Sequence, residues 1–381
     1  MIYFDNAATM KPYPEVIDSF SRDSLDYFGN SESNHAVGLK ASRILEEARA
    51  SILRSLGIGS AHSLIFTSGA TEANNLALKG TAIRYKNRGK KILVSSTEHP
   101  SVYKPLEELA TLFGFEIVKI PCDSFGRANP NTLLSLMDKE TILVSVMAVN
   151  NEIGSKNDIE TISSIVHRFP KCFFHCDATQ AMGKIDLPYE KIDLISFSSH
   201  KFGGLKGNGG LIYKKTMQFL PVIAGGEQEK GFRAGTTNVA GDVATEKALT
   251  ISLKFRAQNY EKEKEIYEFL RNYFLSDPNE FHLHSDAVSE KQTPFVLNVG
   301  FLKKKASVIV EALSNRDIYV SSVSACSSKE NHASSTLLAC GYPLEEAENS
   351  IRISFSGTNT IEEAKAFVVA LQEIMKEVID R

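Results

Sequence analysis

Short apolar runs alternate with amphipathic helical patterns along residues 40–215 of the chain. Apolar runs of this kind predict strands that are buried on both faces of a sheet. The predicted strands span residues 64–67, 91–95, 115–120, 142–150, 173–177, 194–198 and 210–214. Because helical segments separate these strands, the pattern predicts an α/β fold with a mostly parallel, seven-stranded sheet covered by helices on both faces.

The C-terminal third of the chain has a different pattern. Residues 259–274 form a charge-rich helical segment that leads out of the predicted sheet. Strands are predicted at residues 294–301 and 351–355, and the last helix begins with a capping box formed by Thr360 and Glu363. A chain of 381 residues exceeds the usual size of one compact core. The sequence therefore predicts a second, smaller α+β domain at the C-terminal end.

Composition excludes several classes of protein. Hydrophobic residues make up 43% of the chain and charged residues 23%, as in ordinary globular proteins. A net charge of -3 gives no electrostatic basis for direct binding to nucleic acid or membranes. We expect no secretory signal and no membrane span. The five cysteines lack paired motifs, and the spacing of Cys172 and Cys176 has no second ligand pair. These features favour a reducing, cytoplasmic compartment and no metal site.

Lys201 is the first candidate for chemistry. It closes the apolar run 193–201 and enters a glycine-rich turn, residues 202–210, where the backbone can approach a bound molecule closely. A lysine in a tight, partly desolvated turn suits Schiff-base chemistry with a carbonyl cofactor.

Two further motifs end predicted strands. Residues 67–75, Thr-Ser-Gly-Ala-Thr-Glu-Ala-Asn-Asn, open a helix and form either a phosphate seat or an ordinary strand-to-helix turn. Asp177 either caps a following helix or keeps a pyridine nitrogen protonated. Because the strand that ends at Lys201 follows the strand that ends at Asp177, both should open on one edge of the sheet. A phosphate seat, a ring-nitrogen partner and an imine-forming lysine on one edge predict pyridoxal 5'-phosphate.

Three more residues carry candidate roles. His99 follows the strand 91–95 and could stack on a pyridine ring and move protons. Arg352 could clamp a substrate carboxylate, although its spacing alone favours a surface arginine on an edge strand. Cys326 lies in a small, polar segment that predicts a mobile loop, so its thiol is a candidate nucleophile.

These motifs closely resemble the cysteine desulfurases of the NifS/IscS type, within the class V aminotransferase family. The resemblance implies fold type I of pyridoxal-phosphate enzymes, a homodimer, and mobilisation of sulfur from L-cysteine. It also implies a cofactor-binding large domain over residues 13–255 and a small domain over residues 1–12 and 256–381, with a catalytic loop at about 321–336. The matching segments are 3–9, 29–30 with His35, 68–75, 97–99, 149–154, 177–180, 198–201, 225–228, 233–236, 324–328 and Arg352.

The resemblance implies a role for each matching residue. Lys201 corresponds to the lysine that forms the imine, His99 to the stacking and proton-handling histidine, and Cys326 to the sulfur-accepting cysteine. The cofactor-binding positions are Ala70, Thr71, His99, Asn151, Asp177, Gln180, Ser198, His200 and Lys201, with Thr236 reaching the phosphate of the partner subunit. Asn151 and Arg352 correspond to the anchors of the substrate carboxylate.

Several alternatives remain open on the sequence. The chain could instead be a selenocysteine lyase or another class V enzyme, or a non-enzymatic scaffold that binds sulfur-carrier proteins. If it is a desulfurase, the sulfur acceptor could be an iron–sulfur cluster scaffold or a tRNA-thiolation enzyme.

Overall fold

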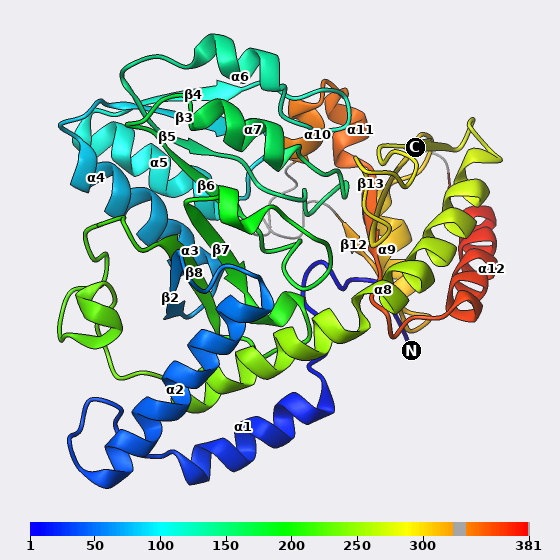
Figure 1. Cartoon of the computed structure of the whole chain (residues 1–381). Helices are drawn as coiled ribbons and strands as arrows, with labels where there is room; N and C mark the ends of the chain where they lie inside the picture. Colours follow the sequence, from blue (N-terminus) through cyan, green and yellow to red (C-terminus); the bar gives the residue numbers. More distant parts are fainter. Residues whose placement is uncertain (323–332, 380–381) are drawn as a thin grey trace.

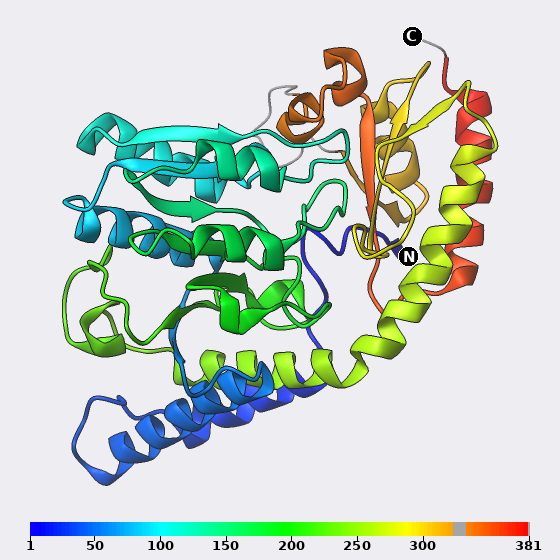
Figure 2. The ribbon, with the colours of Figure 1, turned by 45° about the horizontal axis from the view of Figure 1, so that its top comes forward.

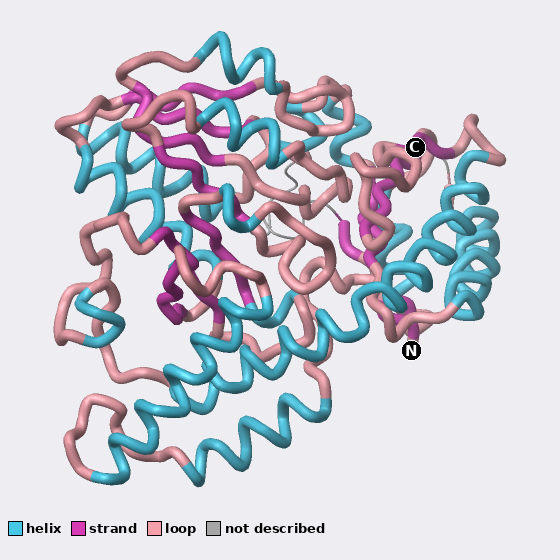
Figure 3. Tube along the Cα trace, in the orientation of Figure 1, coloured by secondary structure: helices cyan, strands magenta, loops and turns pink. Residues whose placement is uncertain are grey.

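A computed structural model describes residues 1–322 and 333–379 of the chain. The predicted α/β fold is confirmed, and its strands form two main groups (Figure 3). The larger group is a seven-stranded sheet in the order β2-β8-β7-β6-β5-β3-β4, in which only β8 runs antiparallel to its neighbours. Its strands are β2 (His62–Thr67), β3 (Lys91–Ser95), β4 (Glu116–Ile120), β5 (Thr141–Ser145), β6 (Phe173–Asp177), β7 (Leu194–Ser198) and β8 (Gly209–Lys214).

Helices cover both faces of this sheet, as the alternating pattern predicts (Figure 1). Side chains from α1, α2, α6, α7 and α8 share one apolar core with the sheet, and side chains from α3, α4 and α5 share the other. The bounds are α1 (Pro14–Asp26), α2 (Ala36–Ser55), α3 (Ala70–Asn75), α4 (Thr81–Tyr85), α5 (Pro100–Phe113), α6 (Pro130–Leu136), α7 (Ile159–Val166) and α8 (Val239–Leu275). Short helical turns are η1 (Leu76–Gly80), η2 (Tyr189–Lys191), η3 (Ser199–Lys201) and η4 (Gln228–Gly231).

A smaller antiparallel sheet lies beside the large one, in the order β12-β13-β10-β9. The N-terminal strand β1 pairs with β11 in the same part of the molecule. The strands are β1 (Ile2–Tyr3), β9 (Phe281–Leu283), β10 (Val296–Phe301), β11 (Ile318–Tyr319), β12 (Ser321–Ser322) and β13 (Ser350–Ser354). The helices are α9 (Ala306–Ser314), α10 (Ser335–Ala339), α11 (Leu344–Glu348) and α12 (Ile361–Glu377).

Helix α8 connects the two sheets (Figure 2). Its first half contributes Ala244 and Leu249 to the core of the large sheet, and its second half contributes Ile266 and Leu270 to the core of the small sheet. There it lies beside α12, whose N-terminus carries the predicted capping box. We propose that the two domains divide within α8, near residue 255.

Two boundaries differ from the sequence patterns. Strand β5 ends at Ser145, although the N–H groups of Val146 and Ala148 still donate to carbonyls at the end of β6. The charged helical segment 259–274 is the second half of a longer helix, because α8 begins at Val239. None of the helices in the described part of the chain is long and apolar enough to cross a membrane.

Candidate active site

A cavity of about 220 Å³ lies at the carboxyl edge of the large sheet, beside the small sheet. Parallel strands place their carboxyl ends along one edge, so residues far apart in sequence meet there. The cavity is lined by Ala7, Ala8, Ala70, Thr71, His99, Ser101, Met147, Val149, Asn151, Asp177, Thr179, Gln180, Ser198, His200, Lys201 and Arg352. Of the predicted site residues that the structure describes, it therefore brings together all except Thr236.

Lys201 reaches the cavity from the short helical turn η3 that follows β7. Its Nζ donates to the carbonyl oxygens of Ala7 at 2.6 Å and Ala8 at 2.7 Å. The turn behind it requires glycine, because a Cβ on Gly204 would lie 1.9 Å from the hydroxyl oxygen of Ser199. The N-terminal segment thus orients the lysine amine, a role that no local pattern at residues 7 and 8 predicted.

Asp177 ends β6, the strand next to β7. Its carboxylate is buried and accepts hydrogen bonds from Asn74 Nδ2 at 2.8 Å and from the N–H of Thr179 at 2.9 Å. Residues 178–188 contain no helix, so Asp177 does not cap one. Asn74 also donates to Ser101, which fixes the carboxylate in the cavity wall. The motif at residues 67–75 does not by itself indicate this orienting role for Asn74.

The opposite part of the cavity is formed by the start of α3 and the end of β7. The N–H of Ala70 donates to Ser198 Oγ at 2.7 Å, which ties the two segments together. Gly69, just before α3, has a φ of +145°, and a Cβ there would lie 3.2 Å from the same oxygen. With Thr71 and His200 alongside, this region collects hydrogen-bond donors of the kind that bind phosphate. Burial and the nearby Lys201 lower the pKa of His200 to about 4, so this imidazole is neutral at pH 7.

His99 caps helix α5 and faces the cavity. Its Nδ1 accepts a hydrogen bond from the N–H of Ser101 at 3.1 Å. Burial lowers the pKa of His99 below its ordinary value. In a neutral imidazole whose Nδ1 accepts a hydrogen bond, the proton is on Nε2. Nε2 is therefore the nitrogen that can donate a proton to a molecule in the cavity.

Arg352 lies in β13, an interior strand of the small sheet, and is 5% exposed. The interpretation as a surface arginine on an edge strand is therefore wrong. Its guanidinium donates to Asp5 Oδ1 at 2.8 Å and to the carbonyl of Asn151 at 3.0 Å. The remaining Nε is buried and has no hydrogen-bond partner in the described structure. Spacing alone could not find this residue, because its burial depends on the meeting of the two sheets.

The remaining two predicted site residues have different outcomes. Thr236 is exposed and lies away from the cavity of its own chain. Cys326 and most of its predicted loop lie outside the described residues.

The unsatisfied polar atoms of the cavity test whether the predicted cofactor fits. Gln180 Oε1 and Thr179 Oγ1 are buried without a hydrogen-bond partner among the described residues, as is Arg352 Nε. Buried polar atoms rarely stay unpaired in folded proteins, so a polar molecule is expected here. The cavity supplies three kinds of group: hydrogen-bond donors near Ser198 that could bind an anion, the carboxylate of Asp177 and the amine of Lys201. This donor set fits an aromatic phosphate ester that carries a carbonyl and a ring nitrogen.

Glu98 lies behind the cavity and is 4% exposed. Its Oε1 accepts from Ser95 Oγ and from the N–H of Met147, both at 2.6 Å. Burial, together with the negative charge of Asp177, raises the pKa of Glu98 to about 8. The protonated side chain places no second negative charge beside Asp177.

Comparisons with known proteins give consistent similarities along the chain. The family model described as "Aminotransferase class-V" matches residues 2–367. The "NifS/IcsS protein homolog" of Lactobacillus delbrueckii subsp. bulgaricus is 39% identical over 377 residues, 98% of this chain and 97% of that protein. "Cysteine desulfurase IscS 1" of Archaeoglobus fulgidus is 37% identical over 383 residues, 100% of this chain and 97% of that protein. A solved structure described as "NIFS-LIKE PROTEIN" has a TM-score of 0.91 at 32% identity, over 99% of this chain and 100% of that one.

Replacing Glu98 with glutamine should change how stability depends on pH. The unfolded chain loses the Glu98 proton near the ordinary pKa of 4.5, whereas the folded protein keeps it until about pH 8. The stability of the wild type should therefore fall, relative to Glu98→Gln, as the pH rises between these values. The melting temperatures of the wild type and of Glu98→Gln should be most similar near about pH 5. Toward about pH 8, the melting temperature of the variant should rise increasingly above that of the wild type. A constant difference across this range would contradict a raised pKa.

Proposed function

Because the chain belongs to the class-V aminotransferase family, as its motifs predict, we propose that it is a pyridoxal-phosphate-dependent cysteine desulfurase. The proposed reaction converts L-cysteine to L-alanine and releases the sulfur to an acceptor. The names of relatives that match nearly the whole chain support this activity. The observation that carries the proposal is the placement of Lys201 and Asp177 on one cavity at the ends of adjacent strands.

Most residues of the cavity would hold the cofactor. Ala70, Thr71, Ser198 and His200 would bind the phosphate, and Asp177 would hold the proton of the ring nitrogen. Gln180 would donate a hydrogen bond to the ring hydroxyl oxygen through its Nε2, which also donates to the carbonyl of Ala7. When bound, pyridoxal phosphate supplies a carbonyl that condenses with amines and a cationic ring that draws electrons from the substrate Cα.

Arg352 and Asn151 would bind the carboxylate of L-cysteine. The buried, unpaired Nε of Arg352 is a donor that a substrate carboxylate can satisfy, and Asp5 keeps the guanidinium facing the cavity. With the carboxylate held, the Lys201 amine would remove the proton from the substrate Cα. Its contacts with Ala7 and Ala8 hold Nζ at the cavity before substrate arrives.

The sulfur would leave as a persulfide on Cys326. The Cys326 thiolate would attack the substrate sulfur, so that a sulfur–sulfur bond forms as the carbon–sulfur bond breaks. His99 would handle the thiol protons through Nε2. The acceptor would be an iron–sulfur cluster scaffold or a tRNA-thiolation enzyme. Selenocysteine lyase activity is the alternative, because it uses the same cavity chemistry without a persulfide on the enzyme.

We further propose a cytoplasmic homodimer. The four cysteines of the described residues, Cys122, Cys172, Cys176 and Cys340, form no disulfide, as expected in a reducing compartment. Thr236 is exposed and would bind the phosphate in the cavity of the partner subunit.

Replacing Lys201 with alanine should abolish turnover and remove the visible absorption of the cofactor–lysine imine. Loss of a positioned acid–base group alone lowers rates by roughly 10²–10⁴-fold, so alanine formation should fall at least this far. Lys206→Ala is the matched control, because Lys206 is exposed in the same turn. Normal colour and turnover in Lys201→Ala would refute the assignment of the lysine.

Replacing Cys326 with serine should separate the two candidate reactions. A desulfurase that passes sulfur through Cys326 should lose sulfide release from L-cysteine while it keeps the visible absorption of the bound cofactor. The measurement is sulfide release under a reducing agent, with Cys340→Ser as the matched control. Undiminished release by Cys326→Ser would rule out a persulfide on this residue.

A further inference from the structure

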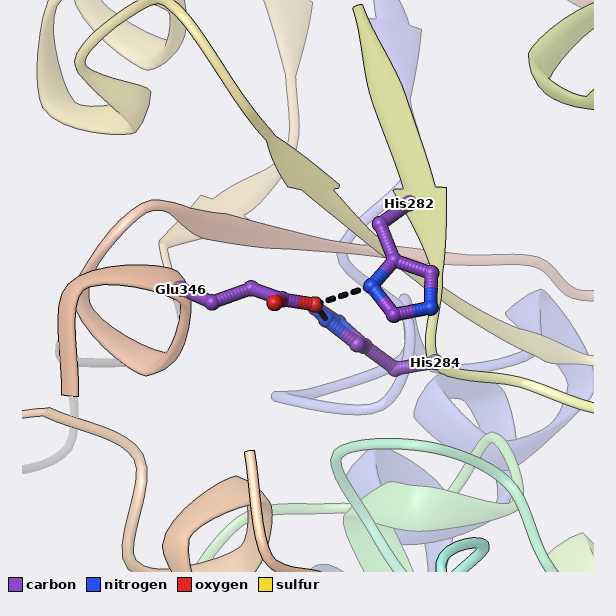
Figure 4. A group of neighbouring side chains, drawn as sticks. All are labelled: His282, His284 and Glu346. Carbon is purple, nitrogen blue, oxygen red and sulfur yellow. Dashed lines mark hydrogen bonds and ion pairs between the residues drawn. The ribbon is translucent and has the colours of Figure 1, made fainter. Parts of the chain in front are cut away.

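A second group of chemically active side chains lies in the small sheet, outside the candidate active site. His282, His284 and Glu346 each offer one ligand atom, and these atoms all lie within 4.8 Å of one another (Figure 4). None of the three residues lines the active-site cavity. The desulfurase reaction assigns them no role.

The local structure of β9 places both imidazoles on one face. Alternate residues of an extended segment point to the same side, so His282 and His284 share a face while Phe281 and Leu283 pack against the small-domain core. On the neighbouring strand β10, Gly300 leaves space for the His284 ring. A Cβ at this position would lie 2.9 Å from Cε1 of that ring. The strand pair therefore holds the two imidazoles next to each other, with Glu346 from α11 facing them (Figure 4).

The hydrogen bonds of Asn298 fix which nitrogen of His284 is available as a ligand. The Asn298 amide donates through Nδ2 to the carbonyl of Glu152, so its Oδ1 is the oxygen that faces His284 Nδ1, at 2.6 Å. His284 Nδ1 must carry a proton to make this hydrogen bond. In the neutral ring, Nε2 is then a bare lone pair, and it faces Glu346 Oε1 at 2.8 Å. The lone pair of Nε2 and the carboxylate oxygen therefore face the same small space, as two ligand atoms of one site do.

We propose that His282 Nδ1, His284 Nε2 and the Glu346 carboxylate bind a zinc-class divalent metal ion. Two imidazoles and one carboxylate are ligands that zinc uses, with water in the fourth position. Asn298 would support the metal site by accepting the hydrogen bond from His284 Nδ1. This hydrogen bond fixes the tautomer whose Nε2 lone pair faces the ion. The His282 side chain is 48% exposed and also pairs with Glu346, so the ion can enter from solvent.

The ion would join two parts of the small domain that are distant in sequence. His282 and His284 belong to the strand β9 segment, whereas Glu346 belongs to the short helix α11. The carbonyl of Ala347, also in α11, accepts from the N–H of Ser334 just before α10. Zinc would therefore fasten the α10–α11 segment to the sheet and stabilise the folded domain, because it binds the folded chain more tightly than the unfolded chain.

Zinc titration of the untagged, cofactor-loaded protein tests this site. After metal is removed with a chelator, the protein is dialysed against ZnCl₂ and the bound zinc is counted by mass spectrometry. We expect about one zinc ion per chain, as one three-residue site predicts. His282→Ala and Glu346→Gln should each weaken binding by at least about 10–100-fold, the loss usual for a supporting residue. Zinc should also raise the melting temperature of the wild type but not of His282→Ala.

His167→Ala is the matched control. His167 also pairs with a carboxylate, through Nε2 to Asp193 at 3.1 Å, but no third ligand lies beside it among the described residues. This variant should bind zinc like the wild type. Because His282 is half-exposed, His282→Ala should keep the far-UV circular dichroism of the wild type. A loss of zinc binding in this variant would then not be due to unfolding.

Two results would overturn the proposal: a wild type that binds no zinc stoichiometrically, or unchanged binding in His282→Ala and Glu346→Gln. The first would mean that the group is an imidazolium–carboxylate pair, and the second that zinc binds elsewhere, for example at free thiols.

Discussion

The pairing of β6 with β7 is the constraint on which the candidate active site depends. Both strands run parallel, and their register opposes Asp177 to Ser196, so Asp177 and the turn that carries Lys201 open on the same edge. A reversed strand would send one of these groups to the far end of the sheet. The buried contact of Asp177 with Asn74 and the partly buried contact of Lys201 with Ala7 then fix the two side chains against one cavity.

The small domain completes the site from the other side. Strand β1 pairs with β11, and the chain then crosses to the large sheet, where Ala7 and Ala8 meet Lys201. From β13, Arg352 reaches back to Asp5 and to the carbonyl of Asn151. The first residues of the chain thus contact both the amine and the guanidinium. Movement between the domains would change the distance between the two groups that the proposed mechanism requires.

The alternation of apolar runs and helical segments predicted the seven-stranded sheet and the edge that carries the site residues. Strands of a parallel sheet are continuous runs of apolar residues, and polar residues mark where these runs end. Motifs likewise predicted Lys201 and Asp177. Spacing alone misjudged Arg352, whose burial arises only when the two sheets meet. It also gave no reason to select His282 and His284, because their third partner lies far along the chain and two histidines in a strand are not a site by themselves. Contacts between distant segments were the missing information.

A crystal structure of the protein grown with pyridoxal phosphate and without substrate would show whether Lys201 and Asp177 hold the same cofactor. We expect continuous density between Lys201 Nζ and the cofactor, with the Asp177 carboxylate at hydrogen-bonding distance from the ring nitrogen. Cofactor bound elsewhere, or bound in this cavity with Asp177 turned away from the ring, would contradict this expectation.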